Sequence, residues 1–130
     1  MDEWLVRLKL WGAGLGLILA GVLGGADTLL YTLICFVAAD YLIGLAKAVL
    51  QKDFRWDQMF SGGLKKMLIF VVVAVATTLD RLWPADGIAF RSLTIGYYLA
   101  GEGLSILENA AGCGLPLPGK LKDILGGLRK

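Results

Sequence analysis

Two carboxylates interrupt the last long apolar segment of this chain, and they constrain its fold more than any other feature. The segment runs from Tyr98 to Asn109 and reads Tyr-Leu-Ala-Gly-Glu-Gly-Leu-Ser-Ile-Leu-Glu-Asn, with Glu102 and Glu108 inside it. A charged side chain at the centre of a bilayer costs about 2.5–3.5 kcal/mol on insertion scales. If this segment crosses a membrane, its charges have to meet other helices or water.

On a helix, the polar and small residues of this segment gather on one side. At about 100° per residue they occupy an arc of about 120°, and larger apolar residues fill the rest of the circumference. The residues that we call the polar stripe are Glu102, Ser105, Glu108 and Asn109. Two interpretations of the stripe remain open. It either joins helices through polar contacts, each worth about 1 kcal/mol or less, or it faces water in some state of an assembly.

The composition indicates a single domain that lies in a membrane. Of the 130 residues, 57% are hydrophobic and only 18% are charged, which is too apolar for a soluble domain of this size. The net charge of +2 is too small to imply a nucleic-acid partner. The chain contains no His, which is the commonest general base and metal ligand. We therefore expect no catalytic residue, no metal, no cofactor and no enzymatic activity.

Four hydrophobic segments predict an all-α integral membrane protein that forms one membrane domain over residues 1–130. The predicted spans cover about residues 10–26, 28–46, 64–83 and 92–111, and a short amphipathic helix covers 119–130. Within the third span, the uninterrupted apolar run 67–79 is too short to cross a bilayer core of about 30 Å. Flanking residues extend it to a spanning length, and a re-entrant segment is the alternative.

Basic residues are distributed unequally between the two ends of these spans. The N-terminal segment, the connection between the second and third spans and the tail carry most of them, whereas Arg81 and Arg91 lie at the other end. The excess of positive charge on cytoplasmic segments therefore predicts that both termini are cytoplasmic. The basic residues that we expect at the membrane surface include Lys65, Lys66, Lys120 and Lys122.

Small residues predict where helices pack closely. In the first span they recur every four residues, at Gly12, Gly16, Ala20 and Gly24. Such a ridge lets two helix backbones approach, either within the chain or between copies. In the second span, Asp40 lies too deep for its short side chain to reach bulk water. We expect Asp40 to face the bundle interior, where Gly44 on the same face leaves room for a partner.

Several strings in the chain fall in a shared pattern over roughly residues 28–128. They are Gly101-Glu-Gly-Leu-Ser-Ile-Leu-Glu-Asn109, Gly114-Leu-Pro-Leu-Pro118 with the Lys/Leu tail after it, Asp40-Tyr41-x-x-Gly44, Gly63-x-Lys65-Lys66 and Leu79-Asp80. Together they resemble the toxin-secretion and phage-lysis holin family. The string around the two glutamates is the most specific of them.

The resemblance implies a holin of the bacterial cytoplasmic membrane. Such a multi-pass protein forms homo-oligomers in the lipid bilayer, then opens lesions that release an endolysin or a toxin without necessarily binding it. The polar stripe and Asp40 would be polar contacts at rest and line water in the lesion. An alternative is a small dimeric four-helix ion channel or cation transporter with a membrane-embedded Glu. A structural membrane subunit is a third interpretation.

Overall fold

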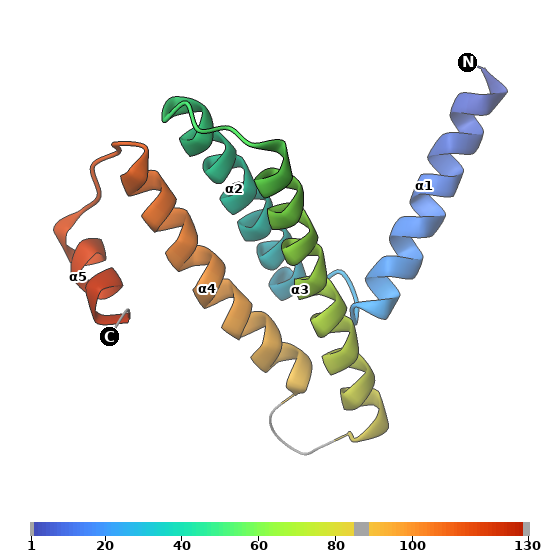
Figure 1. The fold of residues 1–130 in the computed structure, drawn as a ribbon. Helices are drawn as coiled ribbons and strands as arrows, with labels where there is room; N and C mark the ends of the chain where they lie inside the picture. The colour runs from blue at the N-terminus through green and yellow to red at the C-terminus, as the bar shows by residue number, and fades with distance from the viewer. Residues whose placement is uncertain (1, 85–88, 129–130) are drawn as a thin grey trace.

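The computed structural model describes residues 2–84 and 89–128, which contain α-helices joined by short connections (Figure 1). The helices are α1 (Glu3–Val22), α2 (Thr28–Leu50), α3 (Trp56–Leu82), α4 (Phe90–Gly112) and α5 (Gly119–Leu128). The predicted all-α class is confirmed, and α1, α2 and α3 are long and apolar enough to cross a membrane. The predicted tail helix is described as far as Leu128, because residues 129–130 lie outside the described residues.

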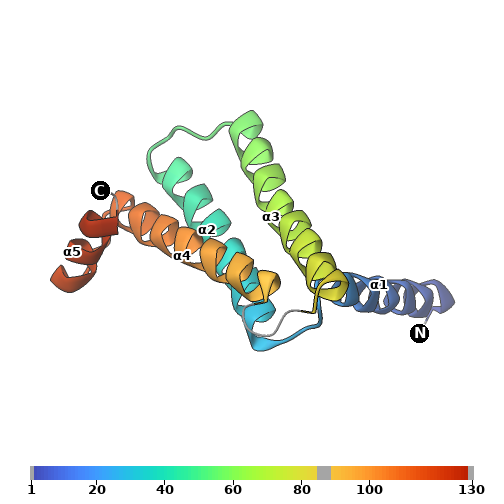
Figure 2. The same ribbon diagram turned by 90° about the horizontal axis from the view of Figure 1, so that it is seen from below.

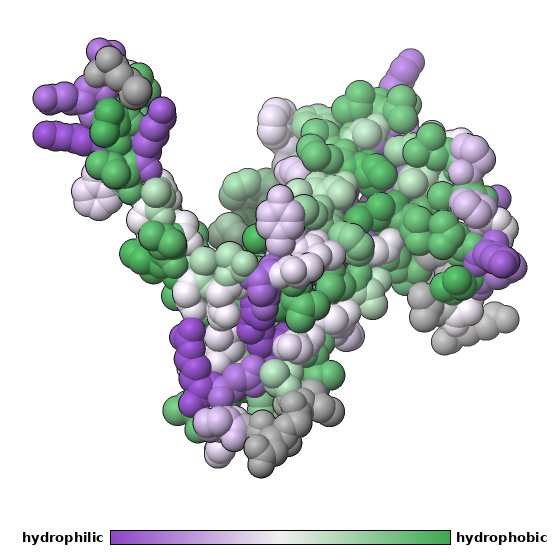
Figure 3. Space-filling model, turned by 180° about the vertical axis from the view of Figure 1, so that it is seen from behind, coloured by the Kyte–Doolittle hydropathy of each residue, from purple (hydrophilic) through white to green (hydrophobic). Residues whose placement is uncertain are grey.

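Helices α2, α3 and α4 form a bundle from which α1 points away (Figures 1 and 2). The bundle core lies toward the end where α2 and α4 begin, and it consists of Leu33, Val37, Ile69, Val73 and Ile95. Most other large apolar side chains face outward. Figure 3 shows them covering much of one face, with hydrophilic residues at the free end of α1 and low on the bundle. This distribution suits lipid, which solvates apolar side chains as well as a protein core does.

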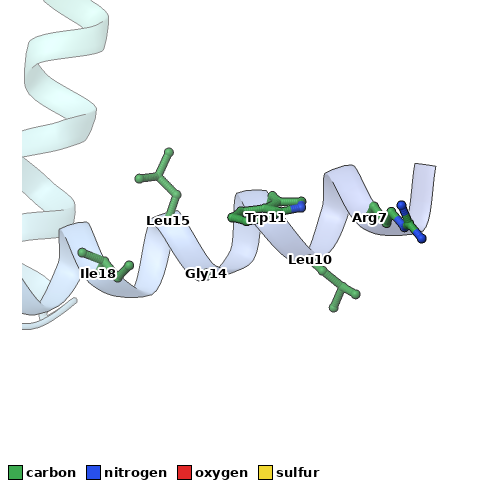
Figure 4. Close-up of a pocket in the computed structure, with 6 residues that line it drawn as sticks. All are labelled: Arg7, Leu10, Trp11, Gly14, Leu15 and Ile18. Atoms are coloured by element: carbon green, nitrogen blue, oxygen red, sulfur yellow. The ribbon is translucent and has the colours of Figure 1, made fainter. Parts of the chain in front are cut away.

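Helix α1 packs against the bundle only near its C-terminal end. None of its residues from Glu3 to Val22 is buried. Near that end, Arg81 Nη2 donates a hydrogen bond to the carbonyl oxygen of Gly21 at 2.7 Å. A hollow of about 410 Å³ lies against α1, and all six residues that line it come from α1 itself (Figure 4). A Cβ atom at Gly12 or Gly16 would meet nothing within 4 Å, so this part of the ridge faces outward from the single chain.

Two helix boundaries differ from the sequence prediction. Helix α1 ends at Val22, so Gly24 lies in the following turn and not on the helical ridge. Helix α3 begins at Trp56, so Gly62-Gly63 lies within the helix, before the start that was predicted near residue 64. Tyr41 of α2 supports this first part of α3, because its ring packs against the helix at Gly63. A Cβ atom at Gly63 would lie 3.6 Å from the ring carbon Cε2. Its hydroxyl also donates to the carbonyl oxygen of Met59 at 3.2 Å.

Candidate functional site

Three charged side chains from three helices meet inside the bundle. Asp40 lies on α2, Lys66 on α3 and Glu102 on α4, each ten or more residues from either end of its helix. Asp40 is 4% exposed, and the side chains of Glu102 and Lys66 are 12% and 20% exposed. The three charges are therefore held near the middle of the helices, with most of their surface covered by the bundle.

The ammonium group of Lys66 joins the two carboxylates. Its Nζ donates to Asp40 Oδ2 at 2.6 Å and to Glu102 Oε2 at 2.8 Å. The other oxygen of Asp40, Oδ1, accepts hydrogen bonds from Ser105 Oγ at 2.8 Å and from Asn109 Nδ2 at 3.1 Å. Across residues 2–84 and 89–128, every buried side-chain nitrogen or oxygen has a hydrogen-bond partner. We call Asp40, Lys66, Glu102, Ser105 and Asn109 the ion cluster.

The structure brings Asp40 together with three members of the polar stripe. Asp40 faces the interior, and one turn further along α2 a Cβ atom at Gly44 would lie 3.9 Å from Asn109 Nδ2. The glycine thus leaves room for the amide group that reaches Asp40. Glu108, the fourth residue of the stripe, is half-buried on α4. In the single chain, most of the stripe is thus turned toward the other helices.

The position of Lys66 corrects the sequence prediction, which placed it at the membrane surface. Helix α3 begins early enough to carry Lys66 about 15 Å along its axis. Lys65, the neighbouring residue, is exposed, as are Lys120 and Lys122 on α5. The sequence offered one signal for Lys66, because a nearby cation is one way to compensate a buried carboxylate.

The ion cluster holds two carboxylates and one ammonium group, so a single cation is shared between two acidic side chains. Each carboxylate loses hydration on burial, and the shared ammonium compensates for part of that loss. Within the described residues, no group of three or more His, Cys, Asp or Glu side chains is arranged to hold a metal ion. The geometry is that of a polar contact among three helices, with its hydrogen-bonding groups turned away from lipid.

A second polar network joins the start of α4 to the turn between α1 and α2. Arg91 is buried, and its Nε donates to the carbonyl oxygen of Leu23 at 2.6 Å. Its Nη2 donates to the carbonyl oxygen of Gly25 at 3.0 Å. Both Nη atoms also bind the Asp27 carboxylate, at 2.7 and 3.0 Å. One guanidinium group thus fixes the turn that positions α1.

Asp27 also caps α2, and this arrangement predicts a dependence of stability on pH. The hydrogen bond from Arg91, followed by one from the backbone N–H of Leu30, lowers the pKa of Asp27 from 3.8 to about 2. Because the folded-state pKa is depressed, the stabilisation is present above the unfolded pKa and is lost as the pH falls from about 4 to about 2. Unfolding temperatures in detergent should show the advantage of the wild type over Asp27→Asn shrinking across that range.

The Asn variant is the matched control, because Asn caps a helix about as well as Asp but does not titrate. An advantage of the wild type that stays constant between pH 5 and pH 2 would contradict the assignment.

Comparison with known proteins identifies relatives along most of the chain. The model of the bacteriophage holin family matches residues 17–130. The chain is 41% identical over 124 residues to an uncharacterized 14.9 kDa protein in the nagH 3' region of Clostridium perfringens, covering 95% of this chain and 94% of the relative. It is 34% identical over 120 residues to an uncharacterized protein of Listeria monocytogenes, covering 92% and 85%.

A phage protein is also among these relatives. The chain is 37% identical over 86 residues to a probable holin of Bacillus phage phi105, covering 66% of this chain and 63% of the relative. No solved structure matches the chain significantly. The range matched by the family model includes every residue of the ion cluster and of the Arg91 network.

Proposed function

Since the chain belongs to the bacteriophage holin family, we propose that it oligomerises in the bacterial cytoplasmic membrane and opens lesions that release an endolysin or a toxin. The family match over residues 17–130 is the observation that carries this proposal. Family membership and three apolar helices make the chain a multi-pass membrane protein. Membership also favours a non-enzymatic role in lysis.

The proposal includes α4 as a fourth span, with both termini in the cytoplasm. Helix α4 has 23 residues, which corresponds to about 35 Å, and it packs along α2 (Figure 1). The N-terminal end of α1, the connection from α2 to α3 and the C-terminal end of α4 lie toward one end of the molecule in Figure 1. This arrangement supports the topology expected from the basic residues.

The ion cluster supplies the polar groups that the proposed lesion needs. At rest, Lys66 binds the Glu102 carboxylate and Asp40 binds the Asn109 amide within one chain. When the oligomer rearranges into a lesion, the same polar groups face water. The apolar sides of the helices stay in contact with lipid or with neighbouring copies. The small-residue ridge at Gly12, Gly16 and Ala20, which faces outward at the two glycines, is proposed as a surface where copies pack.

Leakage from liposomes tests the proposal directly. The purified chain is reconstituted with a small dye and a folded protein of about 20 kDa trapped in the lumen. We expect both to escape above a threshold density of the chain. Release of dye or ions alone, saturable and sensitive to a proton gradient, would instead favour the cation transporter, for which the charges at mid-helix are the supporting observation.

Lysis timing tests the role of the polar stripe. Replacing Glu102 or Glu108 by Gln removes a charge while it keeps the shape of the side chain. We expect each change to shift the onset of lysis in cells that co-express an endolysin, because burying or hydrating a carboxylate contributes to the energy difference between the two states. If both single variants and the double variant keep the wild-type timing and oligomer size, the stripe serves packing alone.

A further inference from the structure

A groove between α2 and α3 leads from the connection between these helices to the ion cluster. It has a volume of about 330 Å³. At its outer end it is lined by Ala48 and Gln58, which lie close to the adjoining ends of the two helices. At its inner end it is lined by Asp40, Lys66 and Asn109. We call this space the polar groove.

Two glycines keep the polar groove open. Gly44 and Gly62 line it from α2 and α3. A Cβ atom at Gly62 would meet nothing within 4 Å, and one at Gly44 would approach only Asn109 Nδ2, at 3.9 Å. The groove therefore has room for small molecules along its length. Its carboxylate, ammonium and amide groups offer the several polar partners that a buried water requires.

Two side chains separate the polar groove from a neighbouring, mainly apolar groove. A second groove between α2 and α3, of about 350 Å³, is lined mainly by apolar residues such as Val37 and Phe70. Tyr41 and Lys66 line both grooves and therefore stand between them. Tyr41 is fixed in this position by its hydrogen bond to the carbonyl oxygen of Met59. Beyond the ion cluster, the buried core begins at Val37.

We infer that the polar groove is a vestibule for water and small water-soluble cations, open at the α2–α3 connection and closed at the ion cluster. Asp40 is then hydrated from one side of the membrane only, and the buried core beyond it is the dry barrier. This vestibule belongs to the single chain at rest, so it does not depend on lesion formation. It requires that α2 and α3 lie in the membrane and that Asn109 of α4 lines the inner end of the groove.

Cysteine labelling of the full chain in vesicles tests the inference. Cys35 and Cys113 are replaced by Ala, and one cysteine is introduced as Gly44→Cys or Gly62→Cys. The matched control is Leu42→Cys, because Leu42 lies on α2 beside Gly44 in sequence but is 62% exposed on the outside of the bundle. The probe is a membrane-impermeant cationic methanethiosulfonate reagent, which reacts with hydrated thiolates.

The reagent is added to two vesicle preparations, in which the chain is inserted in opposite orientations. The two groove cysteines should react about tenfold or more faster than the control cysteine. They should do so only in the preparation that exposes the α2–α3 connection to the reagent. A single-cysteine protein trapped in the lumen reports any passage of reagent, so leakage through lesions is separated from access through the groove. Rates equal to that of Leu42→Cys, or equal reaction from both sides with the luminal reporter unmodified, would overturn the inference. Because the two groove positions lie on different helices, misfolding of one variant leaves the other as the test.

Discussion

Replacing Lys66 by Met is expected to lower the free energy of unfolding by about 3–5 kcal/mol, the range measured when one partner of a buried ion pair is removed. The Met side chain fills a similar volume but brings no charge. Asp40 and Glu102 then stay buried without the ammonium group that lies 2.6 and 2.8 Å from their oxygens. Thermal unfolding in detergent, followed by circular dichroism, measures the loss.

The neighbouring residue provides a matched control for this prediction. Lys65 is exposed, so Lys65→Met should change stability by about 0.5 kcal/mol or less. Adding Asp40→Asn and Glu102→Gln to Lys66→Met removes the unpaired charges, and we expect this triple variant to regain most of the lost stability. If Lys66→Met is as stable as Lys65→Met, the ion cluster contributes nothing to the fold.

Replacing Gly24 by Ala is expected to cost about 2–4 kcal/mol, from backbone strain and lost hydrogen bonds together. Gly24 has a φ of +92°, in the left-handed region that a residue with a Cβ atom rarely adopts. The added Cβ would also lie 2.6 Å from Arg91 Cδ and 3.1 Å from Thr77 Cγ2. The Arg91 guanidinium group therefore has to leave the carbonyl oxygens of Leu23 and Gly25 that it binds. Thermal unfolding in detergent measures the loss of stability.

Gly25 separates the two contributions. Its φ is +107°, yet a Cβ atom there would meet nothing within 4 Å. Gly25→Ala should therefore show only the backbone strain, of about 1–2 kcal/mol. Equal losses for Gly24→Ala and Gly25→Ala would contradict the close packing of Arg91 against the turn.

The acidic and amide residues of the ion cluster were predictable because their chemistry excludes most other placements. A carboxylate deep in an apolar helix has to face the interior, which applies to Asp40 and Glu102. Helical periodicity alone then places Ser105 and Asn109 on the same side as Glu102. What periodicity does not supply is the contact between helices, so the pairing of Asp40 with Asn109 required the structure.

Lys66 was missed because local signals pointed to a surface. A pair of lysines after two glycines is typical of the start of a membrane helix, where long side chains reach the headgroups. The contact between Tyr41 and the first turns of α3 overrides that local pattern. Gly24 was assigned to a packing ridge for a similar reason, since its four-residue spacing from Ala20 hides the end of α1 at Val22.

Helix α4 depends on earlier helices for the bonds that its own sequence does not provide. Its first turn has no side-chain cap from Ala89, and Asp80 at the end of α3 accepts the backbone N–H groups of Phe90 at 2.7 Å and Arg91 at 3.0 Å instead. Further along, Lys66 supplies the countercharge of Glu102. In lipid, each such group without a partner would cost several kcal/mol.

This dependence sets an order for biogenesis. In the proposed topology, the translocation machinery meets α4 after α2 and α3, and those two helices carry the groups that satisfy it. We expect α4 to leave the insertion channel alongside the preceding hairpin as one unit. A nascent chain that stops before α4 would then hold three helices whose Lys66–Asp40 ion pair lacks the partners that α4 provides, namely Glu102, Ser105 and Asn109.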